Sequence, residues 1–198
     1  MKNTNRLMHK WAGYFAVMLA VALIAACQSA RAQASTNEAS AAAAPAVVTP
    51  PVRINAGATD KITNSAGNVW LPDQGFADGD TFAADDAEIT NTPDAVLYRT
   101  ERFGMTAYNF VVPNGKYTVK LHFAEVYSGI TGPGERVFSF NVQGHEFKDF
   151  DIWVKAGGFS KAYVESVDVE VTGGKLNITF TPNVENPKIS GIEILPRS

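Results

Sequence analysis

The chain has 198 residues, 45% of them hydrophobic and 19% charged, with a formal net charge of −3 at pH 7. This length suffices for one domain with a substantial core, and an acidic balance without a Lys/Arg cluster argues against nucleic acid and anionic lipid headgroups as partners. The single cysteine, Cys27, excludes an internal disulfide, a thiolate zinc site and a cysteine nucleophile from the domain that follows it.

The first 27 residues have the layout of a secretory signal. Lys2, Arg6 and Lys10 form a positive start, and residues 11–26 are an uncharged, mostly apolar run. That run is shorter than the ~20 residues that a membrane-spanning helix needs. We therefore predict an exported protein with no transmembrane helix in its mature form. Removing residues 1–26 takes away three basic residues and no acidic one, which leaves the remainder near −6.

The signal ends in Leu23-Ile24-Ala25-Ala26-Cys27, which resembles a bacterial lipobox. In such a motif small residues precede a cysteine that is lipidated and becomes the mature N-terminus. This predicts a lipid anchor at Cys27 and a lipoprotein of the cell envelope, in the periplasm or at the cell surface. Two alternatives stay open: Cys27 is only a small apolar residue, or cleavage follows Ala32-Gln33-Ala34 and the protein is secreted.

Residues 28–51 are predicted to be a linker. The segment is rich in Ala, with Ser, Thr, Gln and Pro, and has almost no large apolar residue to bury. As a flexible coil it would span roughly 25–30 Å, which suffices to hold a domain clear of a membrane surface.

Residues 52–198 form the predicted domain, in which hydrophobic residues recur with a period of two. Between residues 116 and 123, Tyr117, Val119, Leu121 and Phe123 share one face of a predicted strand. The same alternation marks further strands at residues 137–142, 167–172 and 176–181, and no convincing 3.6-residue period occurs after residue 51. Strands with one solvent-exposed face and one buried face are typical of antiparallel sheets. Turn signals between them, at residues 113–115, 132–134, 143–145, 157–158 and 172–174, indicate an all-β fold, an antiparallel β-sandwich or jelly roll.

Residues 59–94 break this regularity. They are rich in Asp, Gly, Thr and Asn, which predicts long loops, and loops on a rigid sandwich often carry binding function. Asp73, Asp78 and Asp80 are among several acids here that would suit calcium by ligand type. A solvated loop is the simpler interpretation, so we expect no metal and no cofactor.

Six short strings in the domain resemble the malectin family of carbohydrate-binding domains. In chain order they are Val52-Arg53-Ile54-Asn55-Ala56-Gly57, Tyr98-Arg99-Thr100-Glu101-Arg102, Phe123-Ala124-Glu125-Val126-Tyr127, Arg136-Val137-Phe138, Asp149-Phe150-Asp151-Ile152 and Asn186-Pro187-Lys188-Ile189. Each string alone is a weak signal, but their common order is specific. The resemblance implies a galactose-binding-like β-sandwich that binds oligosaccharides without catalysis. Bacterial members are often appended to glycoside hydrolases.

The resemblance also implies site residues. In the animal endoplasmic-reticulum lectin that names the family, aromatic side chains and one acid contact the sugar, and they fall here on Tyr98, Tyr127 and Glu185. Asn186 follows that acid. A second aromatic after Tyr127 is replaced by Ser128, and a further loop tyrosine has no clear counterpart; Trp70, Phe76 or Phe82 could serve, and we take Trp70 as the candidate.

These residue types suit a sugar for physical reasons. An aromatic ring covers the apolar C–H face of a sugar ring, and its negative π face attracts those polarised hydrogens. A carboxylate accepts strong hydrogen bonds from hydroxyls, and an amide both donates and accepts. Few anchors in a shallow site predict weak binding, on the order of micromolar to millimolar.

Other interpretations of the same residues stay open. Tyr98 could be a core aromatic beside Leu97, and Glu185 a solvated carboxylate. Glu101 and Arg102 are expected to form a structural ion pair or to clamp a loop, and Asp151 to bind backbone N–H groups in a turn.

Catalysis is not expected. Glu125 and Asp151 are a possible glycosidase pair only by residue type, and the domain's two histidines, His122 and His145, are not near a Gly-x-Ser-x-Gly motif. The alternative to sugar binding is a protein-interaction module whose sugar site has decayed, for which the loss of the aromatic at Ser128 argues.

Overall fold

The computed structural model describes residues 45–198. The predicted signal, with Cys27, and the first part of the predicted linker lie outside the described residues. Within residues 45–198 no helix is long and apolar enough to cross a membrane.

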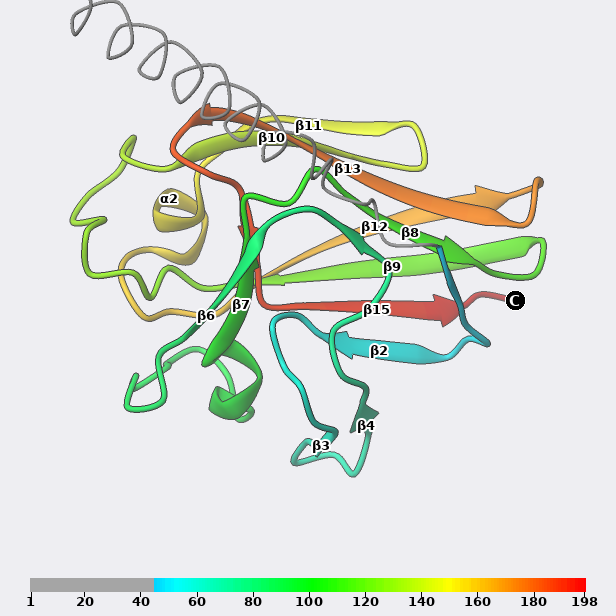
Figure 1. Cartoon of the computed structure of the whole chain (residues 1–198), viewed down its shortest axis with the longest axis horizontal. Coiled ribbons are helices and arrows are strands. Elements are labelled where there is room, and N and C mark those ends of the chain that lie inside the picture. Colours follow the sequence, from blue (N-terminus) through cyan, green and yellow to red (C-terminus); the bar gives the residue numbers. More distant parts are fainter. Residues whose placement is uncertain (1–44) are drawn as a thin grey trace, which may run out of the picture. The chain divides into compact units, whose positions relative to one another are not determined.

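Two sheets form the body of the domain, and all of their strand pairs are antiparallel except β1 with β8 (Figure 1). The larger has the order β1-β8-β13-β10-β11, and β5 also pairs with β8. Its strands are β1 (Ala46–Val47), β5 (Phe76–Ala77), β8 (Ala107–Val111), β10 (Val137–Val142), β11 (His145–Phe150) and β13 (Lys175–Val184). The second sheet has the order β12-β9-β15-β2, with β2 (Val52–Asn55), β9 (Gly115–Phe123), β12 (Tyr163–Val171) and β15 (Gly191–Pro196). The predicted sandwich is confirmed.

The first strand lies within the segment predicted as linker. Ala46 and Val47 of β1 pair in parallel with Phe110 and Val111 of β8, and Val48 is buried. The ordered sheet therefore begins before Val52.

Smaller elements lie at one end of the sandwich. A three-stranded sheet has the order β14-β7-β6, and β3 pairs with β4. Their bounds are β3 (Ile62–Thr63), β4 (Val69–Trp70), β6 (Asp80–Ala83), β7 (Thr100–Phe103) and β14 (Lys188–Ile189). The predicted loop region 59–94 thus contains four very short strands, β3, β4, β5 and β6, and is otherwise irregular. A 3₁₀ helix, η1 (Ala95–Tyr98), leads into β7.

One short α-helix, α2 (Ile152–Ala156), was not expected from the sequence. Its five residues are too few to display a 3.6-residue period. Its ends carry the signals instead: the Asp151 carboxylate accepts a hydrogen bond from Val154 N at 3.1 Å, and Gly157 adopts a left-handed φ of 79°. Asp151 also accepts from Gly134 N at 2.7 Å, which confirms its expected role of binding backbone N–H groups.

The main core lies between the two sheets, because their alternating apolar residues face each other. Phe123 of β9 meets Phe138 and Phe140 of β10 and Phe150 at the end of β11, with ring centroids 4.9 to 6.1 Å apart. Burial of each such side chain stabilises the fold by about 1.5–3 kcal/mol. The result is a rigid platform whose loops carry the candidate site.

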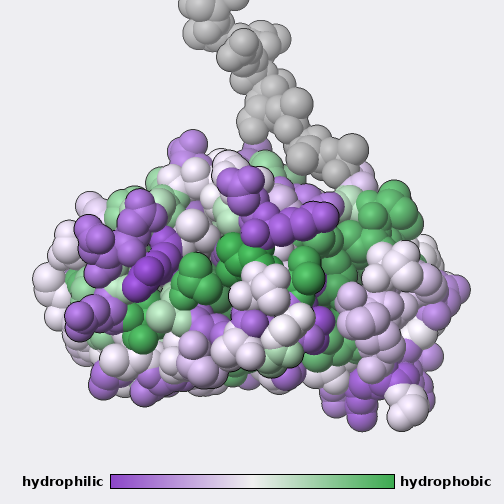
Figure 2. All heavy atoms as spheres, turned by 90° about the horizontal axis from the view of Figure 1, so that it is seen from below, coloured by the Kyte–Doolittle hydropathy of each residue, from purple (hydrophilic) through white to green (hydrophobic). Residues whose placement is uncertain are grey.

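A second core holds the irregular segments against this platform. It contains Trp70, Ile89, Leu97, Tyr98, Ala124, Val126 and Ala162. The face drawn in Figure 2 intersperses hydrophobic groups with polar residues.

Candidate functional site

A pocket of about 250 Å³ lies where five parts of the chain meet. Strand β6 supplies Phe82, β7 supplies Glu101 and Phe103, and the loop after β9 supplies Tyr127. The residue before β10 and the loop between β13 and β14 supply the rest. The full lining is Phe82, Glu101, Phe103, Tyr127, Arg136, Glu185 and Asn186.

Two aromatic rings form the exposed part of this pocket. Tyr127 is 47% exposed and Phe82 is 37% exposed, and their ring centroids lie 6.3 Å apart at an interplanar angle of 84°. The chain passes directly against the tyrosine: a Cβ on Gly129 would lie 2.4 Å from Tyr127 Cε1. The absence of a side chain at Gly129 therefore lets the ring keep its place.

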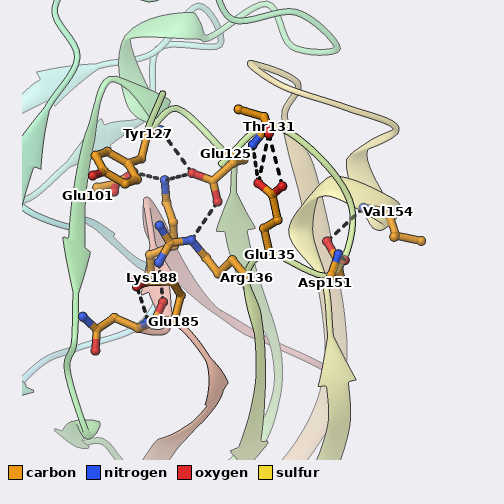
Figure 3. Close-up of polar contacts among 12 residues, drawn as sticks. Glu101, Glu125, Tyr127, Thr131, Glu135, Arg136, Asp151, Val154, Glu185 and Lys188 are labelled. Carbon is orange, nitrogen blue, oxygen red and sulfur yellow. Dashed lines mark hydrogen bonds and ion pairs between the residues drawn. The ribbon is translucent and has the colours of Figure 1, made fainter. Parts of the chain in front are cut away.

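Four buried charges lie beneath and beside the pocket (Figure 3). Lys188 Nζ contacts Glu101 Oε2 and lies 3.3 Å from Glu125 Oε1. Arg136 Nε donates to Glu125 Oε2 at 2.8 Å. Two anions thus meet two cations, which is the balance that buried charges require. Burial raises the pKa of Glu101, and the charge of Lys188 opposes that rise.

The loop before β14 brings a carboxylate and an amide to the pocket. Glu185 has a positive φ of 59°, and its Oε2 accepts from Asn186 N at 3.3 Å. The carbonyl of Asn186 accepts from Arg136 Nη1. Both side chains are exposed to solvent, which places them within reach of a ligand.

The structure brings together three of the five predicted sugar-contact residues, Tyr127, Glu185 and Asn186. It does not bring Tyr98 and Trp70 to them. Tyr98 is 2% exposed and its hydroxyl lies 2.9 Å from His122 Nδ1. Trp70 is also 2% exposed and packs edge-on against His122. Neither ring offers a surface to a ligand, so we correct the prediction and remove both residues from the site.

Phe82 takes the place that the sequence left open for a further aromatic. Phe76, the other alternative, lies under the guanidinium of Arg102, at 3.4 Å from its ring centroid, and pairs with Tyr108. Sequence reasoning missed Glu101, Phe103 and Arg136 as pocket residues. Arg136 opens one of the six family strings, but nothing in the sequence indicates which way its side chain points.

The residues weighed for catalysis do not form a catalytic cleft. Glu125 is 1% exposed and ion-paired, and Asp151 caps α2. His122 is buried between Tyr98 and Glu193, and His145 is exposed at the start of β11.

The acidic loop is tied to the fold. Asp73 pairs with Arg102 Nε at 2.7 Å and accepts from Tyr108 OH at 2.9 Å and Gly57 N at 2.8 Å. Arg102 is thus the loop clamp expected from the sequence. Among residues 45–198 no three His, Cys, Asp or Glu side chains gather as metal ligands would.

The malectin domain family matches residues 51–192 of this chain. The chain belongs to that family. Membership of the malectin family indicates a carbohydrate-binding, lectin-like module.

Known relatives share this domain in longer proteins. The chain is 32% identical to Malectin-B of Xenopus laevis over 124 residues, which cover 54% of this chain and 44% of the relative. It is 31% identical over 152 residues to a probable LRR receptor-like serine/threonine-protein kinase of Arabidopsis thaliana, with 67% and 14% covered. The malectin domain here therefore spans less than half the length of these relatives.

Solved structures show the same fold. A Bacteroides uniformis beta-glucuronidase matches with a TM-score of 0.69 and 22% identity, over 78% of this chain and 20% of that one. The plant receptor-like kinase FER matches with a TM-score of 0.64 and 22% identity, over 72% and 48%.

Proposed function

We propose that this malectin domain binds an oligosaccharide, without catalysis, in the pocket between Tyr127 and Asn186. The observation that carries the proposal is the meeting of an exposed aromatic pair, Tyr127 and Phe82, with the polar side chains of Glu185 and Asn186 in one pocket. A sugar needs both kinds of surface, because each ring has an apolar face and a rim of hydroxyls.

The size of the pocket limits what it takes. At about 250 Å³ it is smaller than the ~300–1,000 Å³ typical of drug-sized ligands, so one sugar unit enters and the neighbouring units lie along the surface. Glu185 is an exposed carboxylate and accepts hydrogen bonds from adjacent hydroxyls. With few anchors, the dissociation constant is on the order of micromolar to millimolar.

We also propose that the protein is exported and tethered to the cell envelope through a lipid on Cys27, in keeping with the signal-like segment and its lipobox. Mass spectrometry of the N-terminal peptide from the native host tests this. A diacylglycerol mass on Cys27 supports the anchor, and an unmodified N-terminus after Ala34 refutes it.

Titration with soluble oligosaccharides, chosen from a glycan array, tests the sugar site. Tyr127→Ala should weaken binding at least about tenfold, since it removes the most exposed ring of the pocket. Phe159→Ala is the matched control, because Phe159 is a comparably exposed aromatic, 40% accessible, that does not line the pocket. Equal losses in the two variants would contradict the assignment of the site. No array signal for the wild type would favour the alternative of a protein-interaction sandwich.

A further inference from the structure

The two sides of the pocket come from segments far apart in the sequence. Tyr127 lies in the loop after β9, and Asn186 lies in the loop between β13 and β14. Neither residue is part of a strand, so no ladder of backbone hydrogen bonds fixes the position of either loop at these points. Backbone bonds from Ile130 N to Tyr127 O at 3.0 Å and from Gly104 N to Pro187 O at 2.8 Å tie each loop to its own surroundings, but they do not connect one loop to the other.

Arg136 makes that connection. Its Nη1 donates to the carbonyl of Asn186, and its Nε donates to Glu125 Oε2 at 2.8 Å. The other oxygen of Glu125 accepts from Tyr127 N at 3.1 Å. A continuous chain of hydrogen bonds thus runs from the backbone of Asn186 to the backbone of Tyr127. Figure 3 shows the guanidinium between the two loops, with the Glu125 carboxylate beside it.

The environment makes this connection firm. Arg136 is 5% exposed and Glu125 is 1% exposed, so water competes little for their hydrogen bonds. Lys188 lies 3.3 Å from Glu125 Oε1 and holds the carboxylate from a third direction. The planar fork of an arginine suits this task, because it directs two donors to two acceptors at once, whereas a lysine is a single point of charge.

We propose that the Glu125–Arg136 pair is the positioning element of the sugar site. It fixes the spacing between the Tyr127 ring and the Glu185–Asn186 loop before the ligand arrives. Preorganised sites bind more tightly because ordering their loops costs nothing further at the moment of binding. The proposal rests on the proposed function: it assigns to these buried residues the control of affinity at the same pocket.

The first test is Arg136→Lys, which keeps the buried positive charge but cannot serve both acceptors. We expect sugar affinity to fall about tenfold, with exchange of the Tyr127 amide hydrogen accelerated and its NMR signal shifted. The matched control is Arg53→Lys, which alters a second, somewhat more exposed arginine–glutamate pair, Arg53 Nε to Glu193 Oε2 at 2.7 Å, outside the pocket. That variant should change neither the affinity nor the Tyr127 amide.

A double-mutant cycle separates positioning from general stability. If Arg136 acts through Tyr127, then Arg136→Lys should cost much less affinity in a Tyr127→Ala background than in the wild type. A full, additive loss there, or an affinity within twofold of wild type in the single variant, would overturn the proposal. Should Arg136→Lys fail to fold, Glu125→Gln gives the same readouts, because the single oxygen of an amide cannot accept from both Arg136 Nε and Tyr127 N, so the connection between the two loops is broken.

The amide measurement needs no ligand, and it therefore distinguishes the two proposals. If the wild type binds no glycan but Arg136→Lys still frees the Tyr127 amide, the sugar function fails and the loop-positioning role stands. If glycan binding is strong and the amide is as protected in Arg136→Lys as in the wild type, the positioning role fails and the sugar function stands.

Discussion

This domain contains two buried polar networks, which are built from similar residues but have different roles. Under the pocket, Arg136 and Lys188 neutralise Glu101 and Glu125. This first network contacts the solvent-exposed pocket residues Tyr127 and Asn186 through their backbones. The second network starts at Tyr98 of the second core, where Tyr98, His122, Glu193 and Arg53 form a chain of contacts at 2.9, 3.1 and 2.7 Å. This chain links η1 and β9 to β15 and β2.

Tyr98 and Tyr127 illustrate the difference between the two networks. Tyr98 is 2% exposed and its hydroxyl is satisfied by His122, whereas Tyr127 is 47% exposed and forms a T-shaped pair with Phe82. The resemblance to the family marks both as sugar contacts. Only the local packing separates an aromatic residue that holds the loops together from one that presents its face to a ligand.

The largest effect we expect comes from breaking the pocket network at its centre. Lys188→Met leaves two buried carboxylates with one guanidinium between them, because Lys188 is fully buried against Glu101 and Glu125. Loss of one partner from a buried ion pair costs about 3–5 kcal/mol. Urea denaturation should show that loss in the free energy of unfolding.

The control for this variant is an exposed pair. Lys148→Met breaks the contact of Lys148 with Glu146, whose side chains are 70% and 56% exposed. Solvent screens such pairs, so the expected change is at most about 1 kcal/mol. Comparable losses in both variants would mean that burial does not set the strength of the pocket network.

A second, smaller effect tests the contrast between the tyrosines. Tyr98→Phe removes the hydroxyl that meets His122 Nδ1 and leaves a buried ring nitrogen without its partner, which costs about 1–3 kcal/mol. Sugar affinity of Tyr98→Phe should stay within twofold of the wild type.

Tyr127→Phe should leave the free energy of unfolding unchanged, within about 0.5 kcal/mol, because the ring is largely in solvent. A glycan-binding loss in Tyr98→Phe without a stability loss would reverse our correction.

The sandwich could be predicted from the sequence because hydrophobic residues alternate with polar residues along the long strands. The alternation at residues 116–123 and 137–142 falls almost exactly on β9 and β10, where one face packs on the phenylalanine cluster. It did not predict α2, which is too short to be periodic, or β1, whose two residues offer no pattern.

The candidate site was predictable only in part. Tyr127, Glu185 and Asn186 follow strand ends, where side chains are usually exposed, and they do line the pocket. Tyr98 and Trp70 lie at the ends of very short elements, η1 and β4, in the irregular part of the chain. No periodic pattern in the sequence there predicts which side chains are buried. Their burial comes from a second core built from seven residues spread between positions 70 and 162. Such long-range packing is not visible in a single sequence.

The smallest effect concerns the pH dependence of the second network. Burial favours the neutral form of Glu193, but the hydrogen bond and charge of His122, with the charges of Arg53 and Lys120, outweigh it and lower the pKa of Glu193. A carboxyl whose pKa is lower in the folded than in the unfolded state stabilises the fold above its unfolded pKa of about 4.3. That contribution is lost as the pH falls through the folded pKa.

Glu193→Gln should therefore differ from the wild type most at pH 5 to 7 and progressively less toward pH 2. The variant keeps the shape of the side chain while removing its charge, so unfolding free energies measured across this range isolate the ionic contribution. Because the Glu193 side chain lies near the surface, with 11% of its area exposed, and its unfavourable burial offsets part of the ionic gain, the expected difference is modest, about 1 kcal/mol at neutral pH. Glycan affinity should follow the same pH profile in both proteins, since the second network does not line the pocket. A sugar affinity that changes with Glu193 would mean that the two networks are coupled and that the distinction between Tyr98 and Tyr127 is incomplete.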